Sequence, residues 1–232
     1  MPANLNDMLK PAREKNKAVG LFNTCSLKLD RGMPEAAEEL LVPVIIGTAE
    51  ILLPVASLEI IADLLLPKAD RASLPVVVHL NLGLREETCR RALDLDFCSI
   101  MYDCSTDSYE VNVQKIGEMA KLAHSYHATI AVGTAHGAYK LPPKLDFDRI
   151  RQIASVIDTF LVLHGGSGLS DEDFHRAIRK DISKVNIFTD INHAVARVAY
   201  ETYAAGKELV TDQQPAMVEA IKQATMEKNA AV

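Results

Sequence analysis

Short apolar runs alternate with segments of helical period along the whole chain. Several runs, such as PVVVHL and FLVLH, are apolar on consecutive positions, which is typical of parallel strands buried on both faces. The predicted strands are Ala18–Phe22, Pro43–Gly47, Pro75–Leu80, Ser99–Asp103, Ala128–Gly133, Phe160–His164 and Lys184–Phe188. Because strands and helical segments alternate about seven times, the pattern predicts a parallel sheet covered by helices.

The segments between these runs carry apolar residues three or four positions apart. The clearest faces are Val113, Ile116, Ala120 and Ala123, and then Phe147, Ile150, Ala154 and Ile157. Pro34 suits a first helical turn, and Ser170 with Asp173 resembles a capping box. A last helix is expected after Pro215, with Val218, Ile221 and Ala224 on its apolar face.

Two α/β arrangements fit this order, a TIM (βα)8 barrel and an open doubly wound sheet. The nucleotide fingerprint GxGxxG is absent after the first strand, which weakens the dinucleotide-binding form of the open sheet. Polar residues follow many of the strands: Asn23, His79, Asn81, Asp103, His136, His164 and Asn186. In a barrel these strand ends converge on one mouth. We therefore favour one barrel domain over residues 1–232, with a C-terminal helical tail.

One irregularity interrupts the alternation. From His127 the chain runs ATIAVGTAHG, with no room for a helix between two strands. A complete barrel takes about 250 residues, so this chain is short by roughly one βα unit. Either the barrel is incomplete or the segment is missing from the sequence; both readings stay open.

Composition and charge narrow the class of protein and its possible partners. The 232 residues are 48% hydrophobic and 24% charged with a net charge of -6, and they hold no basic tract, which argues against nucleic acid or an anionic membrane as partner. The most apolar stretch, Leu40–Leu66, is broken by charges and prolines and cannot span a bilayer. The N-terminus has no apolar signal region. The four cysteines form no CxxC pair, so reduced thiols in a cytoplasmic protein are expected.

Three segments at strand ends could carry chemistry. In Leu163–Gly168 (LHGGSG), successive backbone N–H groups can form an anion-binding nest, or the segment is only a glycine-rich turn. Leu169 excludes the hydrolase pattern GxSxG. Thr134–Lys140 places a histidine and a lysine where they could serve a metal and a phosphate. The end of Lys184–Asp190 either caps the next helix or presents amide and hydroxyl groups to a phosphate.

Taken together, HGAYK, LHGGSG and KVNIFTD in this order resemble the class II (zinc-dependent) ketose-bisphosphate aldolases. The similarity runs almost end to end and includes AVGLFN and MYDCSTDSYEVNV. It implies a barrel enzyme of carbohydrate metabolism and glycolysis, a carbon-carbon lyase. The implied reaction is reversible cleavage of fructose- or tagatose-1,6-bisphosphate to dihydroxyacetone phosphate and glyceraldehyde 3-phosphate. The implied cofactor is Zn²⁺, the implied partner is a phosphorylated sugar, and the implied assembly is a homo-oligomer, dimer or tetramer.

By the same resemblance, His136 and His164 are the zinc ligands, and the metal polarises the substrate ketone. The resemblance also implies contacts to dihydroxyacetone phosphate from Gly137, Gly165, Gly166, Ser167, Asn186, Ile187, Phe188 and Thr189. Lys140 is expected near the phosphate or a monovalent cation.

The chain departs from the family at its third strand. The family reads HLDHG where this chain reads His79-Leu80-Asn81-Leu82-Gly83. Asn81, at the position of the catalytic aspartate, cannot exchange a proton as a carboxyl group does, and Leu82 has no donor atom for a metal. These replacements predict impaired activity.

Two further departures concern the backbone. The family's Glu-Ala-Glu-Leu-Gly segment, with its following loop, helix and strand, is absent between Ile130 and Ala131. At two helix-to-strand turns, where the family usually has glycine, this chain has Asp96 and Asp181. Aspartate tolerates a left-handed turn at some cost.

Two functions therefore stay open. The leading one is a zinc-dependent ketose-bisphosphate aldolase, impaired in this chain. The alternative is a non-catalytic relative that binds phosphate or stabilises a partner subunit. A third possibility is a purely structural barrel, with neither function.

Overall fold

Seven parallel strands form one sheet in the order β5-β4-β3-β2-β1-β7-β6. The structure, a computed structural model, describes residues 3–24, 27–131, 145–155, 160–165 and 169–230. The strands are β1 (Val19–Asn23), β2 (Val44–Ala49), β3 (Val76–Gly83), β4 (Ser99–Tyr102), β5 (Thr129–Ala131), β6 (Leu161–Leu163) and β7 (Ile182–Ile187). Each lies in or overlaps a strand predicted from the sequence, so all seven predictions are confirmed, with ends that differ by a few residues.

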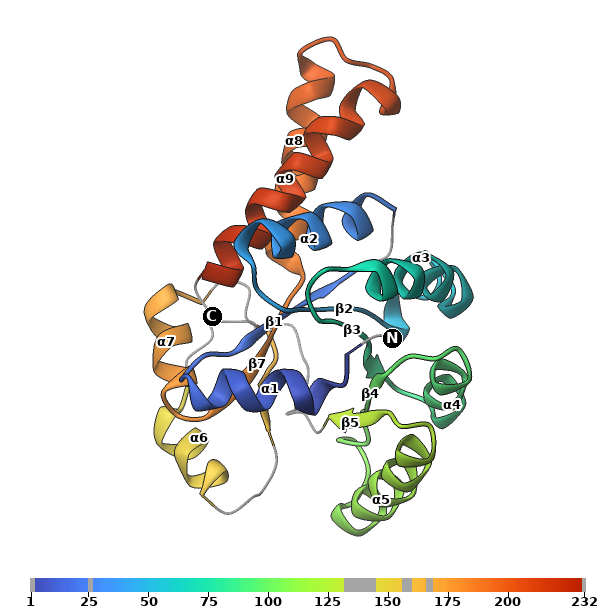
Figure 1. Ribbon diagram of the computed structural model, residues 1–232, viewed down its shortest axis with the longest axis vertical. Helices are drawn as coiled ribbons and strands as arrows, with labels where there is room; N and C mark the ends of the chain where they lie inside the picture. Colours follow the sequence, from blue (N-terminus) through green and yellow to red (C-terminus); the bar gives the residue numbers. More distant parts are fainter. Residues whose placement is uncertain (1–2, 25–26, 132–144, 156–159, 166–168, 231–232) are drawn as a thin grey trace.

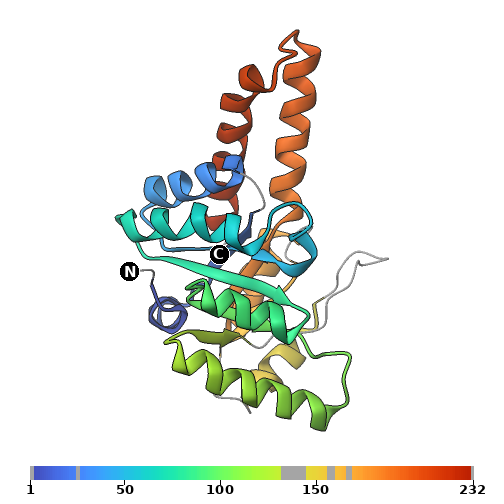
Figure 2. The same ribbon diagram turned by 90° about the vertical axis from the view of Figure 1, so that its right-hand side faces the viewer.

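Helices cover the outside of the sheet, apart from the first, which precedes β1 and packs against the inward face (Figure 1). They are α1 (Leu5–Glu14), α2 (Leu27–Leu40), α3 (Leu58–Arg71), α4 (Glu86–Asp94), α5 (Tyr109–Ser125), α6 (Phe147–Ala154), α7 (Asp171–Ile178), α8 (Thr189–Ala204) and α9 (Val210–Ala230), with the 3₁₀ turn η1 (Glu50–Leu52). Figure 2 shows α8 and α9 side by side, projecting from the body as a hairpin. No helix in the described part of the chain is long and apolar enough to cross a membrane.

The sheet is a partial TIM-like barrel. β1 pairs with both β2 and β7, so the first and last strands are joined as in a closed barrel. Within the described ranges, β5 pairs only with β4 and β6 only with β7. The full eight-stranded barrel expected by resemblance is thus not observed in the described residues, and the open side lies between β5 and β6.

The two faces of the sheet bury different cores. The outward face, with Phe22, Ile46 and Val78, packs against the surrounding helices. The inward face, with Leu21, Ile45 and Val77, packs against Leu5, Met8 and Leu9 of α1. Helix α1 therefore fills the interior from the amino ends of the strands, and the carboxyl ends stay available for a site.

Several local predictions are confirmed. Ser170 caps α7: its Oγ accepts from the Asp173 backbone N–H at 3.2 Å and donates to the Asp173 carboxylate at 2.8 Å. Asp96 and Asp181 both have positive φ, 63° and 83°. Cys89, Cys98 and Cys104 are free thiols, as expected.

Three local predictions are wrong. Pro34 lies in the middle of α2, and Pro215 lies within α9, because burial of an amphipathic face outweighs the one backbone hydrogen bond that each proline removes. On α5, Val113 is 54% exposed, and the buried positions are Met119 and Ala123. The face predicted for this helix is therefore buried only at its C-terminal end.

Candidate active site

Three side chains from β3, β6 and β7 meet at the carboxyl ends of the strands. The Asn186 side-chain amide donates to Asn81 Oδ1 at 2.8 Å and to His164 Nδ1 at 2.8 Å. All three residues are buried. The amide uses both of its hydrogens in these bonds, so it fixes the His164 ring and the Asn81 side chain relative to each other. The sequence predicted all three residues at the site, and the structure brings them together.

A bulge in β3 explains why two consecutive residues belong to this site. Thr48 of β2 pairs with Leu80, but its neighbour Ala49 pairs with Leu82, so β3 holds one extra residue there. Such a bulge breaks the alternation of side chains. Leu82 consequently packs with Ala49 and Met101 in the inward core, on the same side as Asn81.

A second polar layer lies directly below, toward the amino ends of the strands. Lys184 Nζ lies 3.0 Å from His79 Nε2, and His79 Nδ1 lies 2.8 Å from Ser99 Oγ. All three residues are fully buried. Burial lowers the pKa of Lys184 to about 7. Burial, followed by the charge of Lys184, lowers the pKa of His79 well below its usual range.

Close approach of β2 and β3 helps to place His79. A Cβ on Gly47 would lie 2.0 Å from the backbone oxygen of His79. Only glycine therefore fits beside His79, and the glycine lets the two strands pair at this level.

Two buried amide oxygens beside this cluster have no hydrogen-bond partner in the described structure. They are Oδ1 of Asn23, at the end of β1, and Oδ1 of Asn186. Leu21 of β1 pairs with Asn186 of β7, so the two amides lie on adjacent strands. Because buried polar atoms are normally paired, these acceptors favour a ligand that donates hydrogen bonds, such as a polyol.

Glu50 ties the end of β2 to the turn after β3. Its carboxylate accepts from the backbone N–H groups of Leu84 at 2.7 Å and Arg85 at 3.0 Å and also pairs with the Arg85 guanidinium. Burial alone would raise the pKa of Glu50, but the hydrogen bonds from Arg85 and Leu84 bring it below its usual value. This clamp supports the bulged end of β3.

The described residues do not fit a tight zinc centre. They contain no group of three His, Cys, Asp or Glu side chains that could hold a metal. His164 is in place, but Leu82 stands in the apolar core where a second imidazole would be needed. A catalytic zinc usually has three protein ligands.

Most of the other predicted site residues lie outside the described part of the chain. They are His136, Gly137, Lys140, Gly166 and Ser167. Gly165 follows His164 with a φ of 68°, which its lack of a side chain permits.

The run after Asn186 divides at the end of β7. The Ile187 side chain packs in the outward core, so only its backbone could contact a ligand in the mouth. Phe188 is the N-cap of α8 and makes no side-chain cap, and Thr189 is the first residue of that helix. Thr189 and Asp190 therefore do not cap α8, which was the alternative interpretation of this segment.

Lys184 and Glu50 were not singled out from the sequence. A signal existed for Lys184, because it alternates with Val185 and precedes Asn186 by two positions, which places both polar side chains on one face of β7. Glu50 gave no such signal, since an acid after a strand is normally exposed.

Comparison with known proteins identifies the family of the chain. The family described as Fructose-bisphosphate aldolase class-II matches residues 3–130 and 128–231. The two matched pieces meet at residues 128–130, at β5.

Individual relatives are aldolases. The chain is 27% identical to a fructose-bisphosphate aldolase of Staphylococcus epidermidis, over 89% of this chain and 87% of that protein. It is 28% identical to a sulfofructosephosphate aldolase of Alkalicoccus urumqiensis, over 81% and 80%. The crystal structure of the YdjI aldolase from Escherichia coli K12 superposes with a TM-score of 0.93 at 25% identity, covering 100% of this chain and 97% of that one.

Proposed function

Because the chain belongs to the class II fructose-bisphosphate aldolase family, we propose that its mouth binds a phosphorylated ketose and cleaves it only slowly. The reaction would be reversible aldol cleavage to dihydroxyacetone phosphate and an aldehyde. The observation that carries this proposal is the Asn81–Asn186–His164 cluster, which joins three strand ends but contains no carboxyl group.

Binding is supported by groups that the replacements on β3 leave untouched. The unpaired amide oxygens of Asn23 and Asn186 can accept hydrogen bonds from sugar hydroxyls. The first turn of α8 has no side-chain cap, so its backbone N–H groups can meet a phosphate. The names of both relatives denote phosphorylated sugars, which supports a ligand of this class.

Slow chemistry is supported by the end of β3. Aldol cleavage requires proton transfer at a substrate hydroxyl, which the Asn81 amide can orient but not perform. General acid–base catalysis is typically worth 10²–10⁴-fold. We infer that zinc binds weakly, because Leu82 leaves only His164 and the sequence-predicted ligand His136, and we assign no step to the metal.

We also infer that the chain lacks one βα unit of the family barrel after Ile130. The family match in two pieces supports this. The alignment with the Staphylococcus epidermidis relative spans 252 positions, more than the 232 residues of this chain, so it contains positions at which this chain has no residue.

A second function is favoured by the same end of β3. With Asn81 and Leu82 in place of a carboxyl group and a metal ligand, the chain could bind phosphorylated sugars without turning them over, as a non-catalytic subunit. A coupled assay of aldehyde release separates the two, because the non-catalytic subunit gives no signal above buffer.

Calorimetric titration with dihydroxyacetone phosphate tests the binding that both functions share. We expect saturable binding and a melting temperature that rises with ligand concentration. Asn186→Ala should weaken binding, whereas Gln223→Ala, at an exposed position of α9 where the side chain bonds to Glu219, serves as control. Absence of binding at millimolar ligand would contradict a ketose-phosphate site in the mouth.

A further inference from the structure

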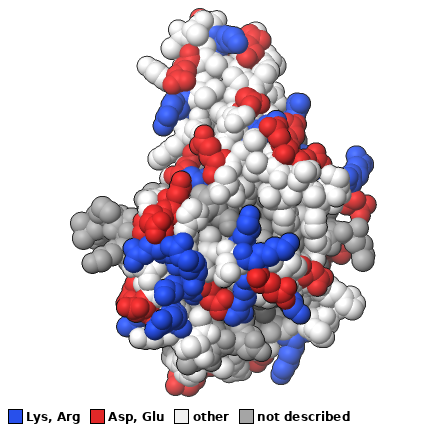
Figure 3. All heavy atoms as spheres, turned by 60° about the vertical axis from the view of Figure 1, so that its left-hand side comes forward, with Lys and Arg blue, Asp and Glu red and all other residues white. Residues whose placement is uncertain are grey.

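A basic pocket lies at the opposite pole of the barrel from the mouth. Its walls come from the end of α1, the end of α6 and the turn between α7 and β7, next to the amino ends of β1, β6 and β7. Figure 3 shows Lys and Arg side chains gathered over the lower part of this face. The pocket encloses about 280 Å³, enough for a small organic ligand.

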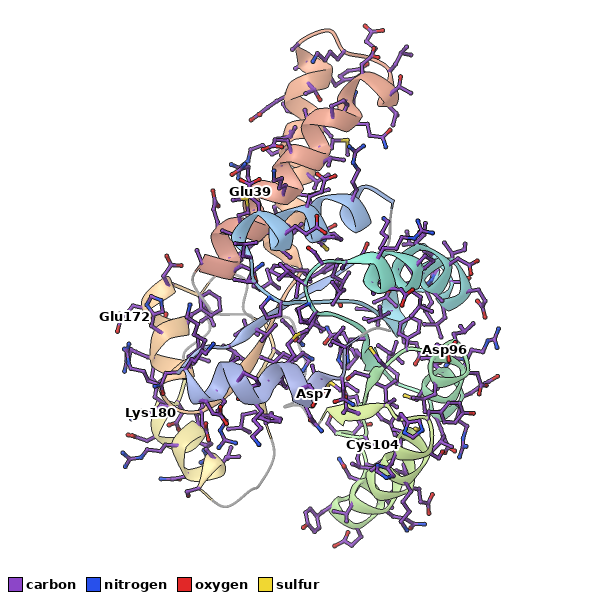
Figure 4. The ribbon with its side chains drawn as sticks, viewed as in Figure 1. Asp7, Glu39, Asp96, Cys104, Glu172 and Lys180 are labelled. Atoms are coloured by element: carbon purple, nitrogen blue, oxygen red, sulfur yellow. The ribbon has the colours of Figure 1, made fainter. Side chains whose placement is uncertain are left out.

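The pocket concentrates positive charge in a protein of net charge -6. Among the described residues, five cationic side chains line it and one acidic side chain does: Arg13, Lys17, Arg151, Arg179 and Lys180 against Asp181. Lys180 and Glu172 are labelled in Figure 4, on the side of α6 and α7. Such a balance attracts anions and disfavours cations.

Two acidic residues of this region, Asp181 and Glu172, are already engaged. Asp181 pairs with Arg13 through both carboxylate oxygens. Glu172 lies 3.2 Å from Arg179, on the outer side of α7. Among the described residues, no carboxylate pairs with Lys17, Arg151 or Lys180. These three cations are therefore available to a ligand.

Asp181 indicates that the pocket is held in shape at some cost. Its φ of 83° is a conformation in which glycine is free of strain. Glycine could not, however, hold the Arg13 guanidinium, which donates to Asp181 Oδ1 at 2.6 Å. The aspartate thus fixes an arginine at the wall of the pocket, and the strain is offset by the bidentate ion pair.

The lining is not only charged. Ala154, Ile178 and Ile182 give it an apolar part beside the cations. From this combination we propose that the pocket binds a small organic phosphate, with the phosphate between Arg151 and Lys180 and the carbon skeleton against Ile178 and Ile182. This site is separate from the mouth and does not depend on the function proposed for it.

Calorimetric titration of the full chain with glycerol 3-phosphate, and separately with inorganic phosphate, tests the proposal. Arg151→Gln with Lys180→Gln should raise the dissociation constant of the pocket about tenfold or more, because two charge-assisted contacts are lost. Lys121→Gln with Lys207→Gln removes two exposed lysines elsewhere and should leave binding unchanged. Melting temperatures without ligand check that each variant is folded.

The outcomes separate the pocket from the mouth. Asn186→Ala should keep the binding that the Arg151/Lys180 variant loses. The proposal is overturned if the Arg151/Lys180 variant binds as the unmodified chain does, or if Asn186→Ala alone abolishes all binding. Glycerol 3-phosphate should bind more tightly than inorganic phosphate, and equal affinities would overturn the assignment of an organic ligand.

Discussion

The ends of β6 and β7 and the end of β3 face the same mouth, but they differ in what they retain. At β6 and β7, His164 and Asn186 match the aldolase motifs and are joined by a hydrogen bond. At β3, where the resemblance leads us to expect an aspartate and a histidine, the chain has the uncharged Asn81 and Leu82, and Leu82 packs in the inward core.

The difference separates two kinds of chemistry. Binding a sugar phosphate relies on amides and backbone N–H groups, which the β6 and β7 ends supply. Proton transfer and metal binding rely on a carboxylate and an imidazole, neither of which Asn81 or Leu82 supplies. The comparison therefore predicts a chain that binds better than it reacts.

The largest expected effect comes from restoring the β3 end. Asn81→Asp with Leu82→His should raise zinc after dialysis from well below one ion to about one per chain, measured by elemental analysis, because a third ligand becomes available. Asn81→Asp alone should not raise the zinc content. One tightly held zinc in the unmodified chain would show that another donor replaces Leu82.

The layer beneath the mouth should make stability depend on pH. The unfolded Lys184 takes up a proton below about pH 10.4, but the folded side chain does so only below a pKa of about 7. Between these values the unfolded state binds more protons, so the free energy of unfolding should rise with pH, by up to about 1.4 kcal/mol per unit.

Lys184→Met is the matched control for this pH dependence. Chemical denaturation from pH 7 to pH 10 should show the slope in the unmodified chain and a smaller slope in the variant. His79, the titratable group that faces Lys184, stays neutral over this range because its pKa is lowered. Equal slopes would mean that Lys184 is not buried as described.

A moderate effect should follow from the β7 end. Asn186→Ala removes the amide that joins His164 and Asn81, and dihydroxyacetone phosphate should bind about tenfold more weakly. Asn81→Ala should weaken binding less, because the replaced end of β3 contributes less to the ligand. If calorimetry shows weaker binding in Asn81→Ala than in Asn186→Ala, the end of β3 contributes more to the ligand than the end of β7, which contradicts the account.

An effect of similar size, on stability rather than binding, concerns the Glu50 clamp just after the bulge. Glu50→Ala leaves the N–H groups of Leu84 and Arg85 without their acceptor and should cost about 1–3 kcal/mol in the free energy of unfolding. Glu87→Ala, on the next helix, should change stability by less than about 0.5 kcal/mol. An equal loss in both variants would show that the clamp does not support β3.

The sequence predicted the sheet well because its signals are local. Consecutive apolar residues such as those of PVVVHL are typical of a strand covered on both faces, and all seven predicted strands lie in the sheet. The helix starts predicted at Pro34 and Pro215 are wrong because tertiary packing decides where α2 and α9 begin. Local sequence rules do not reveal such packing.

The candidate site was predicted in part. His164 and Asn186 follow apolar runs, and the barrel geometry brings such strand ends together. The bulge that turns Leu82 inward depends on the register between β2 and β3, which a single sequence does not reveal. Lys184 was missed since a lysine in a strand is normally exposed, whereas here its Nζ is buried 3.0 Å from His79 Nε2 inside the barrel.

Aldehyde release from fructose 1,6-bisphosphate, coupled to a dehydrogenase and measured with zinc present, tests the central claim most directly. The unmodified chain should be at least about 10²-fold slower than an active relative assayed beside it, because the carboxyl group is missing at Asn81. Turnover comparable to that of the active relative would contradict the claim and would place the catalytic groups elsewhere in the mouth.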